Sequence, residues 1–90
     1  MCLAIPSKII EIGDDNTAVV DTLGMRRRVS LDLMMDPVDV GDYVLIHVGY
    51  AMTKLDEEQA LESIKAYEEL IRLMEEDERD EFWDEVRGES

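Results

Sequence analysis

The sequence predicts a mainly β protein, in which a small OB-like antiparallel β-barrel is followed by a C-terminal α-helix and an acidic tail, for which a helix is one of two alternatives. Short branched apolar runs alternate with turn-forming clusters over the first half, and apolar residues recur at helical spacing over residues 57–74. Acidic residues dominate from residue 75 onward. Ninety residues make one domain, in which we place the barrel at 1–54, the helix at 55–75 and the tail at 76–90.

Four strands are expected from the apolar runs at residues 3–12, 17–22, 25–33 and 43–48. The run 43–48 is the most apolar, so we expect it at the centre of the sheet. Residues 49–52 are expected to leave the sheet, because Gly49 permits a bend that side chains resist. Four or five short strands with tight turns favour a closed barrel, since closure removes exposed strand edges.

A helix from about residue 57 to residue 74 is expected to follow. Asp56 can cap its first turn, and Gln59 stands three residues later, as in a capping box. The spacing of its apolar residues predicts one stripe that packs on the barrel, formed by Ala60, Ile64, Tyr67, Ile71 and Met74.

The tail leaves two alternatives open. Its large apolar residues are Phe82, Trp83 and Val86, at a spacing that allows one short helix docked on the barrel or on a partner. The alternative is a solvated tail, because acidic composition disfavours a packed core.

The formal net charge is −14, and the last sixteen residues, with nine acids and two bases, carry half of it. This negative field repels phosphate backbones, so nucleic acid is not an expected partner. No signal peptide is recognisable, and no apolar stretch approaches the roughly 20 residues of a membrane span. We therefore expect a cytoplasmic protein without membrane contact, in which a lone thiol stays reduced.

The chemistry of the chain centres on Cys2, the only cysteine, and His47, the only histidine. An initiator methionine is usually removed before a small residue, so Cys2 is expected to carry a free α-amine beside its thiol. A cysteine–histidine pair can be an activated nucleophile or two ligands for a transition metal. Two side chains are too few for a closed metal site, so a metal would be shared with a partner or carry its own ligands. Strand alternation places His47 opposite Ile46 and Val48, where a structural role is the alternative.

Two motifs carry a resemblance to a known family. The chain opens with Met-Cys-Leu-Ala-Ile-Pro and continues with Lys8-Ile9, and His47 precedes Val-Gly-Tyr-Ala at residues 48–51. In these motifs, their order and their separation, the chain resembles the HypC/HybG/HupF family of small chaperones for NiFe-hydrogenase maturation. The resemblance covers about residues 1–75. Ser7 stands where glycine is frequent in the family, which bears on the turn after Pro6.

The resemblance implies an OB-like β-barrel with a C-terminal helix and a chaperone rather than an enzyme. It implies two protein partners, the scaffold protein HypD and the immature hydrogenase large subunit. The cargo would be iron with cyanide and carbon monoxide ligands, Fe(CN)2CO, held transiently and not as a tightly bound cofactor. The family's essential cysteine corresponds to Cys2 and its motif histidine to His47. Pro6, Gly49 and Tyr50 are expected to support them, Pro6 by fixing how the N-terminal segment leaves the first strand.

Two other classes of function remain as alternatives. One is a hydrolase in which Cys2 is the nucleophile and its own α-amine the base. Ninety residues leave little room for the substrate cleft and oxyanion pocket that it needs. The other is an OB-type binding module without a metal role. An oligonucleotide binder of that type needs aromatic side chains over a basic groove, which this acidic chain disfavours.

Overall fold

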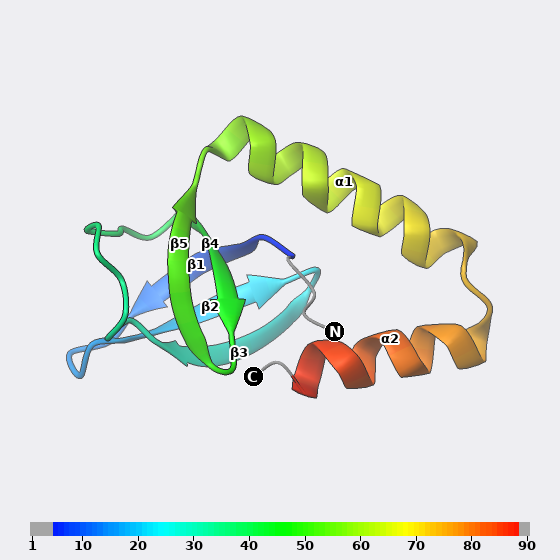
Figure 1. Cartoon of the computed structure of the whole chain (residues 1–90), viewed down its shortest axis with the longest axis horizontal. Coiled ribbons are helices and arrows are strands. Elements are labelled where there is room, and N and C mark those ends of the chain that lie inside the picture. Colours follow the sequence, from blue (N-terminus) through cyan, green and yellow to red (C-terminus); the bar gives the residue numbers. More distant parts are fainter. Residues whose placement is uncertain (1–4, 89–90) are drawn as a thin grey trace.

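The computed structural model describes residues 5–88, with side chains up to residue 86, and shows a closed β-barrel beside a hairpin of two helices (Figure 1). The elements in chain order are β1 (Ser7–Ile12), β2 (Thr17–Thr22), β3 (Met25–Ser30), β4 (Tyr43–His47), β5 (Tyr50–Leu55), α1 (Glu57–Leu73) and α2 (Glu76–Gly88). Neither helix is long and apolar enough to cross a lipid bilayer.

The barrel closes in the order β1-β2-β3-β5-β4. Four of its five pairings are antiparallel, including the β1–β4 pair that completes the circle. The fifth joins β3 to β5 in parallel, with Ser30 opposite Tyr50, and the Ser30 amide donates to the Gly49 carbonyl at 2.8 Å. The small OB-like barrel expected from the sequence is therefore confirmed.

The barrel interior is filled by alternate residues of the strands. This alternation is clearest in β2, where Ala18, Val20 and Thr22 are buried and the residues between them are not. The main core consists of Ile9, Ala18, Val20, Val29, Leu31, Val44, Ile46 and Ala51.

Three strand predictions are wrong. Residues 50–55 form β5 instead of leaving the sheet, because Val48 and Gly49 make a two-residue reversal rather than an exit. The third strand ends at Ser30 and not at residue 33, since Leu31 turns into the loop that precedes β4. The central position expected for β4 also does not hold, because a closed barrel gives every strand two neighbours.

The helices build a second, smaller core at one end of the barrel. Asp56 caps α1 by accepting from the Gln59 amide at 3.3 Å, as expected. The C-terminal part of the predicted α1 stripe packs with α2, and Ile5, which precedes β1, belongs to the same cluster. This second cluster consists of Ile5, Phe82 and Val86, packed against Leu23, Met25, Tyr67, Ile71, Met74 and Trp83.

Candidate functional site

The β4–β5 hairpin brings three of the predicted site residues together. His47 is the last residue of β4 and Tyr50 the first of β5, and the two are directly opposite each other in the ladder. Gly49 lies between them in the turn. His47 is exposed while its neighbour Ile46 is buried at 6 % exposure, so the predicted alternation holds for this pair.

The hairpin turn has an unusual backbone. Val48 has φ 49° and Gly49 has φ 80°, the two positive values that a type I′ turn requires. Glycine adopts this conformation freely, whereas a β-branched residue such as valine is strained there. Val48 is also 58 % exposed, so packing does not explain its presence. Strain that burial does not repay is typical of functional positions.

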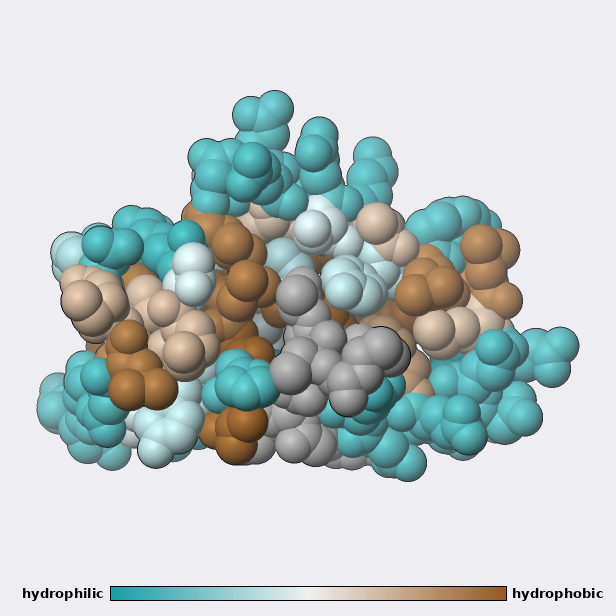
Figure 2. All heavy atoms as spheres, in the orientation of Figure 1, coloured by the Kyte–Doolittle hydropathy of each residue, from teal (hydrophilic) through white to brown (hydrophobic). Residues whose placement is uncertain are grey.

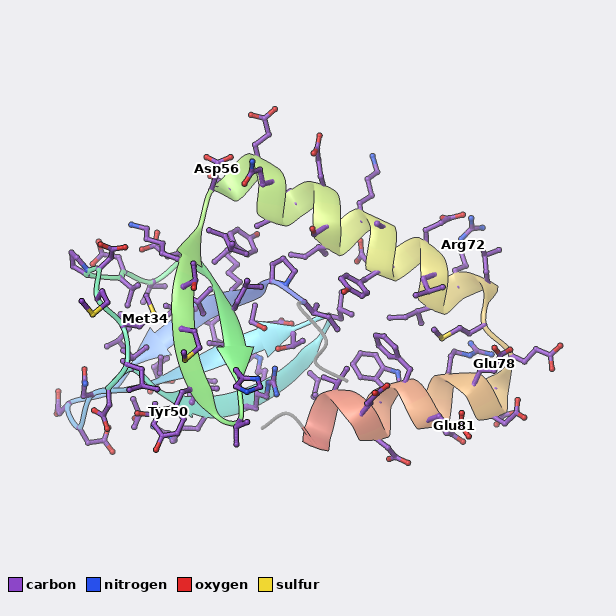
Figure 3. All side chains as sticks on the ribbon, in the orientation of Figure 1. Met34, Tyr50, Asp56, Arg72, Glu78 and Glu81 are labelled. Carbon is purple, nitrogen blue, oxygen red and sulfur yellow. The ribbon has the colours of Figure 1, made fainter. Side chains whose placement is uncertain are left out.

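The hairpin presents apolar side chains to the outside of the barrel. Tyr50 is 40 % and Met52 43 % exposed, next to the exposed Val48. Tyr50 points away from the barrel at the foot of β5 (Figure 3). Because the hydrogen bond from Ser30 to Gly49 fixes the turn, these side chains are held on a rigid support.

Cys2 lies outside the described residues, which begin at the segment that leads into β1. Ile5, Pro6 and Ser7 are all buried, so the chain is held firmly from residue 5 onward. Ile5 contributes to the second core beside Phe82 and Val86. The expected role of Pro6, to orient the segment before it, remains a prediction.

A series of hydrogen-bonded polar side chains also holds the segment that leads into β1. The Ser7 hydroxyl lies 3.4 Å from the Ile5 carbonyl and 2.6 Å from the Thr22 hydroxyl, and both side chains are fully buried. Arg27 donates its Nε to Thr22 at 3.3 Å and its Nη1 to the Val86 carbonyl at 3.1 Å. The Ser7 hydroxyl therefore links β1 to β2, a contact that a glycine at this position could not make.

The clearest electrostatic effects lie in loops outside the hairpin. The Asp39 amide donates to Asp42 at 2.8 Å and, with the Lys54 ammonium at 3.4 Å, holds the pKa of that carboxyl below its usual range. The Thr17 hydroxyl, 2.6 Å from Asp15, does the same for the pKa of Asp15. These carboxylates fix loop geometry and are not general acids at neutral pH.

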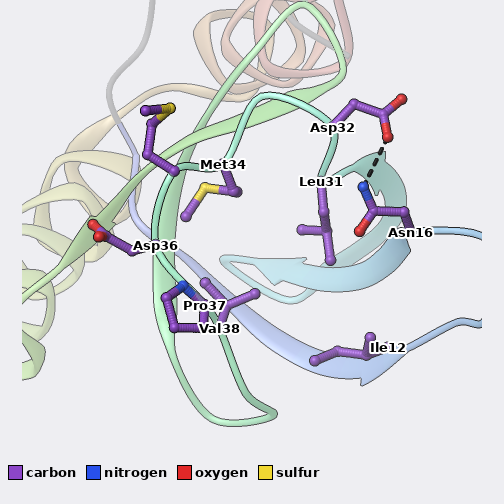
Figure 4. A pocket seen from close by; sticks show the side chains of 9 residues that line it. Ile12, Asn16, Leu31, Asp32, Met34, Asp36, Pro37 and Val38 are labelled. Atoms are coloured by element: carbon purple, nitrogen blue, oxygen red, sulfur yellow. Dashed lines mark hydrogen bonds between the residues drawn. The ribbon is translucent and has the colours of Figure 1, made fainter.

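A pocket that sequence reasoning missed lies at the loop before β4. It encloses about 400 Å³ and is lined by both apolar and acidic side chains (Figure 4). Asp32 accepts from the Asn16 amide at 2.8 Å at its edge, and Met34 packs against the main core. The sequence signal that could have indicated this pocket is a group of four apolar residues, at 33–35 and 38, that lies between aspartates. Of the predicted site residues within the described part of the chain, none lines this pocket.

Taken together, the structure places His47, Gly49 and Tyr50 in one hairpin and Pro6 in the buried entry to β1. Within residues 5–88, no three histidine, cysteine, aspartate or glutamate side chains are grouped as a metal site would require. What the hairpin offers chemically is one imidazole on a rigid turn, beside apolar surface that suits a protein partner.

Comparison with known proteins gives one family. The sequence profile of the HupF/HypC family matches residues 1–67. Hydrogenase maturation factor HypC of Helicobacter hepaticus is 56 % identical over 80 residues, which cover 89 % of this chain and 93 % of that protein. HypC of Cupriavidus necator is 49 % identical over 73 residues, covering 81 % and 80 %. Hydrogenase maturation factor HybG of Escherichia coli K12 is 33 % identical over 75 residues, covering 78 % and 92 %.

Proposed function

The chain belongs to the HupF/HypC family, and from this premise we propose that it is a chaperone of NiFe-hydrogenase maturation. In this role it binds the scaffold protein HypD and the immature hydrogenase large subunit in the cytoplasm. It helps to transfer the Fe(CN)2CO unit from the first to the second, with Cys2 as the ligand. The iron unit is cargo and not a resident cofactor.

The observation that carries the proposal is the match to the HupF/HypC family over residues 1–67, a stretch that contains both Cys2 and the His47 hairpin. In the structure, Ser7 lies opposite Val44 in an antiparallel pair, and His47 is three residues beyond Val44, about 10 Å along a strand. Cys2 precedes Ser7 by five residues in the sequence, a length of chain that spans at most about 17 Å. We therefore propose that the Cys2 thiol acts beside the His47 hairpin.

The ligand chemistry supports sharing of the cargo between proteins. A thiolate is a soft donor that suits a low-spin iron already carrying strong-field ligands. This chain has one cysteine and one histidine, so the rest of the coordination must come from the unit's own ligands or from a partner. His47, held rigidly on its turn, is suited to orient the thiol or to accept its proton.

The family relationship and the hairpin favour this role over a Cys2 hydrolase. The exposed Val48, Tyr50 and Met52 form an apolar rim next to His47, which suits a protein surface better than a small substrate. We infer that HypD or the large subunit covers this rim while Cys2 holds the cargo.

The test is complementation of cells that lack this chaperone. Cys2→Ser should abolish hydrogenase activity, because it replaces an ionisable sulfur with a hydroxyl. The free energy of unfolding, measured by thermal melting, should stay within about 1 kcal/mol of the wild-type value. His47→Gln should reduce activity less. Adding Ser63→Cys to the Cys2→Ser chain is the matched control, because it restores one exposed thiol on α1 and should not rescue. Pull-down of HypD with each variant separates lost binding from lost transfer. Full activity of Cys2→Ser would refute the mechanism.

A further inference from the structure

We propose that the groove between α1 and α2 binds an amphipathic, positively charged helix of a partner protein. The proposal is independent of the role proposed for Cys2, because the groove belongs to the helical hairpin and shares no residue with the β4–β5 turn.

The groove is a hollow of about 300 Å³ with an apolar lining. Tyr67, Leu70 and Met74 contribute from α1, and Phe82 contributes from α2. Phe82 is buried and its ring lies 6.5 Å from that of Tyr67, so the bottom of the groove is firm. Leu70 is 46 % exposed, which leaves apolar surface for a ligand to cover.

One side of the groove is acidic. Glu78, Glu81 and Glu85 line it, and their spacing of three and four residues puts them on one face of α2. Glu78 and Glu81 are labelled on α2 in Figure 3. The ion pairs Lys54–Asp42 and Arg72–Glu69 do not involve these three carboxylates.

The same division is visible on the molecular surface. Figure 2 shows apolar atoms gathered over the last turns of α1, above the hydrophilic atoms that cover α2. A ligand seated there meets leucine and methionine on one side and carboxylates on the other. An amphipathic helix with lysine or arginine beside its apolar face matches this pattern.

Other occupants fit the groove less well. A second copy of this chain would bring the same carboxylates, and two chains of net charge −14 repel each other. A nucleic acid is repelled by the same field. The lining on α2 runs from Glu78 to Glu85, about 12 Å along a helix, so the groove contacts about two turns of a partner helix.

Most of the groove lies beyond the stretch that the family profile matches. The HupF/HypC profile matches residues 1–67, and every lining residue except Tyr67 comes after it. The 80-residue match to HypC of Helicobacter hepaticus extends into this region, so the groove is not separate from what individual relatives share.

Trp83 makes the proposal measurable. It is the only tryptophan, and its ring meets the Phe82 ring edge-on at a centroid separation of 5.4 Å. The probe is a synthetic fourteen-residue peptide with leucine at every third or fourth position and lysine elsewhere. We expect saturable binding that shifts Trp83 emission and weakens when salt is raised from 0.1 to 1 M, which shortens the Debye length from about 10 to about 3 Å.

Matched variants locate the binding surface. Leu70→Ser and the pair Glu81→Gln/Glu85→Gln should each raise the dissociation constant at least about fivefold, as lost apolar contact and lost rim charge predict. Leu61→Ser, whose leucine is 47 % exposed on the far side of α1, is the control for Leu70. Glu62→Gln/Glu68→Gln removes the same charge from exposed positions outside the groove and is the control for the rim.

Three outcomes would overturn the proposal. They are equal binding of a peptide with glutamate in place of lysine, equal weakening by the control variants, and no binding of the lysine peptide to the intact chain. Sedimentation tests the second copy, because self-association lost in Leu70→Ser would assign the groove to a dimer instead. Thermal melts of each variant verify that it is folded. Hydrogenase maturation is not the readout, so failure here leaves the proposed function unaffected.

Discussion

Replacing Val48 with asparagine is expected to stabilise the protein although it removes an apolar side chain. A left-handed backbone conformation costs an ordinary residue roughly 1–2 kcal/mol, and Val48 has φ 49°. Asparagine tolerates this conformation and is preferred before glycine in type I′ turns. Val48 is 58 % exposed, so at most about 1 kcal/mol of burial energy is at stake, part of which asparagine retains.

The expected net gain is about 0.5–1 kcal/mol, which raises the melting temperature by about 2–8 °C for a domain of this size. Thermal unfolding followed by circular dichroism measures it. Leu23→Asn is the matched control, because Leu23 has φ 53° in the β2–β3 turn but packs in the second core. At Leu23, the stability lost with the packing should equal or exceed the stability gained by removing the backbone strain. A Val48→Asn melt at or below that of wild type would refute the strain argument.

Three further predictions concern the barrel. Ile46→Asp should abolish cooperative unfolding, because an unpaired charge in the core costs several kcal/mol and the whole free energy of unfolding is only about 5–15 kcal/mol. A thermal melt without a transition would reveal this. Ser7→Ala should destabilise by about 0.5–1.5 kcal/mol, because the Thr22 hydroxyl loses one of its two partners and keeps Arg27 Nε. In a double-mutant cycle, adding Thr22→Val should cost less than the sum of the two single changes. The pKa of the Asp42 carboxyl is lowered mainly by the hydrogen bond from the Asp39 amide and also by Lys54. The ionised carboxyl therefore stabilises the folded state at pH values above its unfolded pKa. This stabilisation is lost as the pH falls through the lower pKa of the folded state. Asp42→Asn should therefore flatten the acid side of a stability–pH curve, and an unchanged slope would contradict this.

Sequence patterns predicted the barrel best where alternation was regular. In β2 every second residue is buried, and the run 17–22 was identified with the correct bounds. β5 was missed because only Ala51 is buried on it, and its pairing with β4 shifts between Leu45 and Ile46. An irregular register breaks the period of two on which a strand is identified. The turn between β4 and β5 was not predicted, because Val48 is of a residue type that favours strands over turns.

The candidate site was predictable only in part. The His47 motif was found because its residues are adjacent in the chain, and the hairpin keeps them adjacent in space. The groove between the helices was not predicted, because it depends on how the α1 stripe faces α2, a tertiary arrangement that helical periodicity does not specify. The role of Cys2, outside the described residues, stays a prediction.

The two ends of the described chain share one core, and this makes them thermodynamically linked. Ile5 and Val86 belong to the same cluster, and the Arg27 guanidinium ties the Val86 carbonyl to the hydroxyls of the β1 entry. A partner that displaces Ile5 removes part of the support of α2, which hydrogen exchange of the α2 amides would register as faster opening. By reciprocity, a ligand that strengthens the docking of α2 also makes the start of the barrel harder to displace, and by the same coupling free energy.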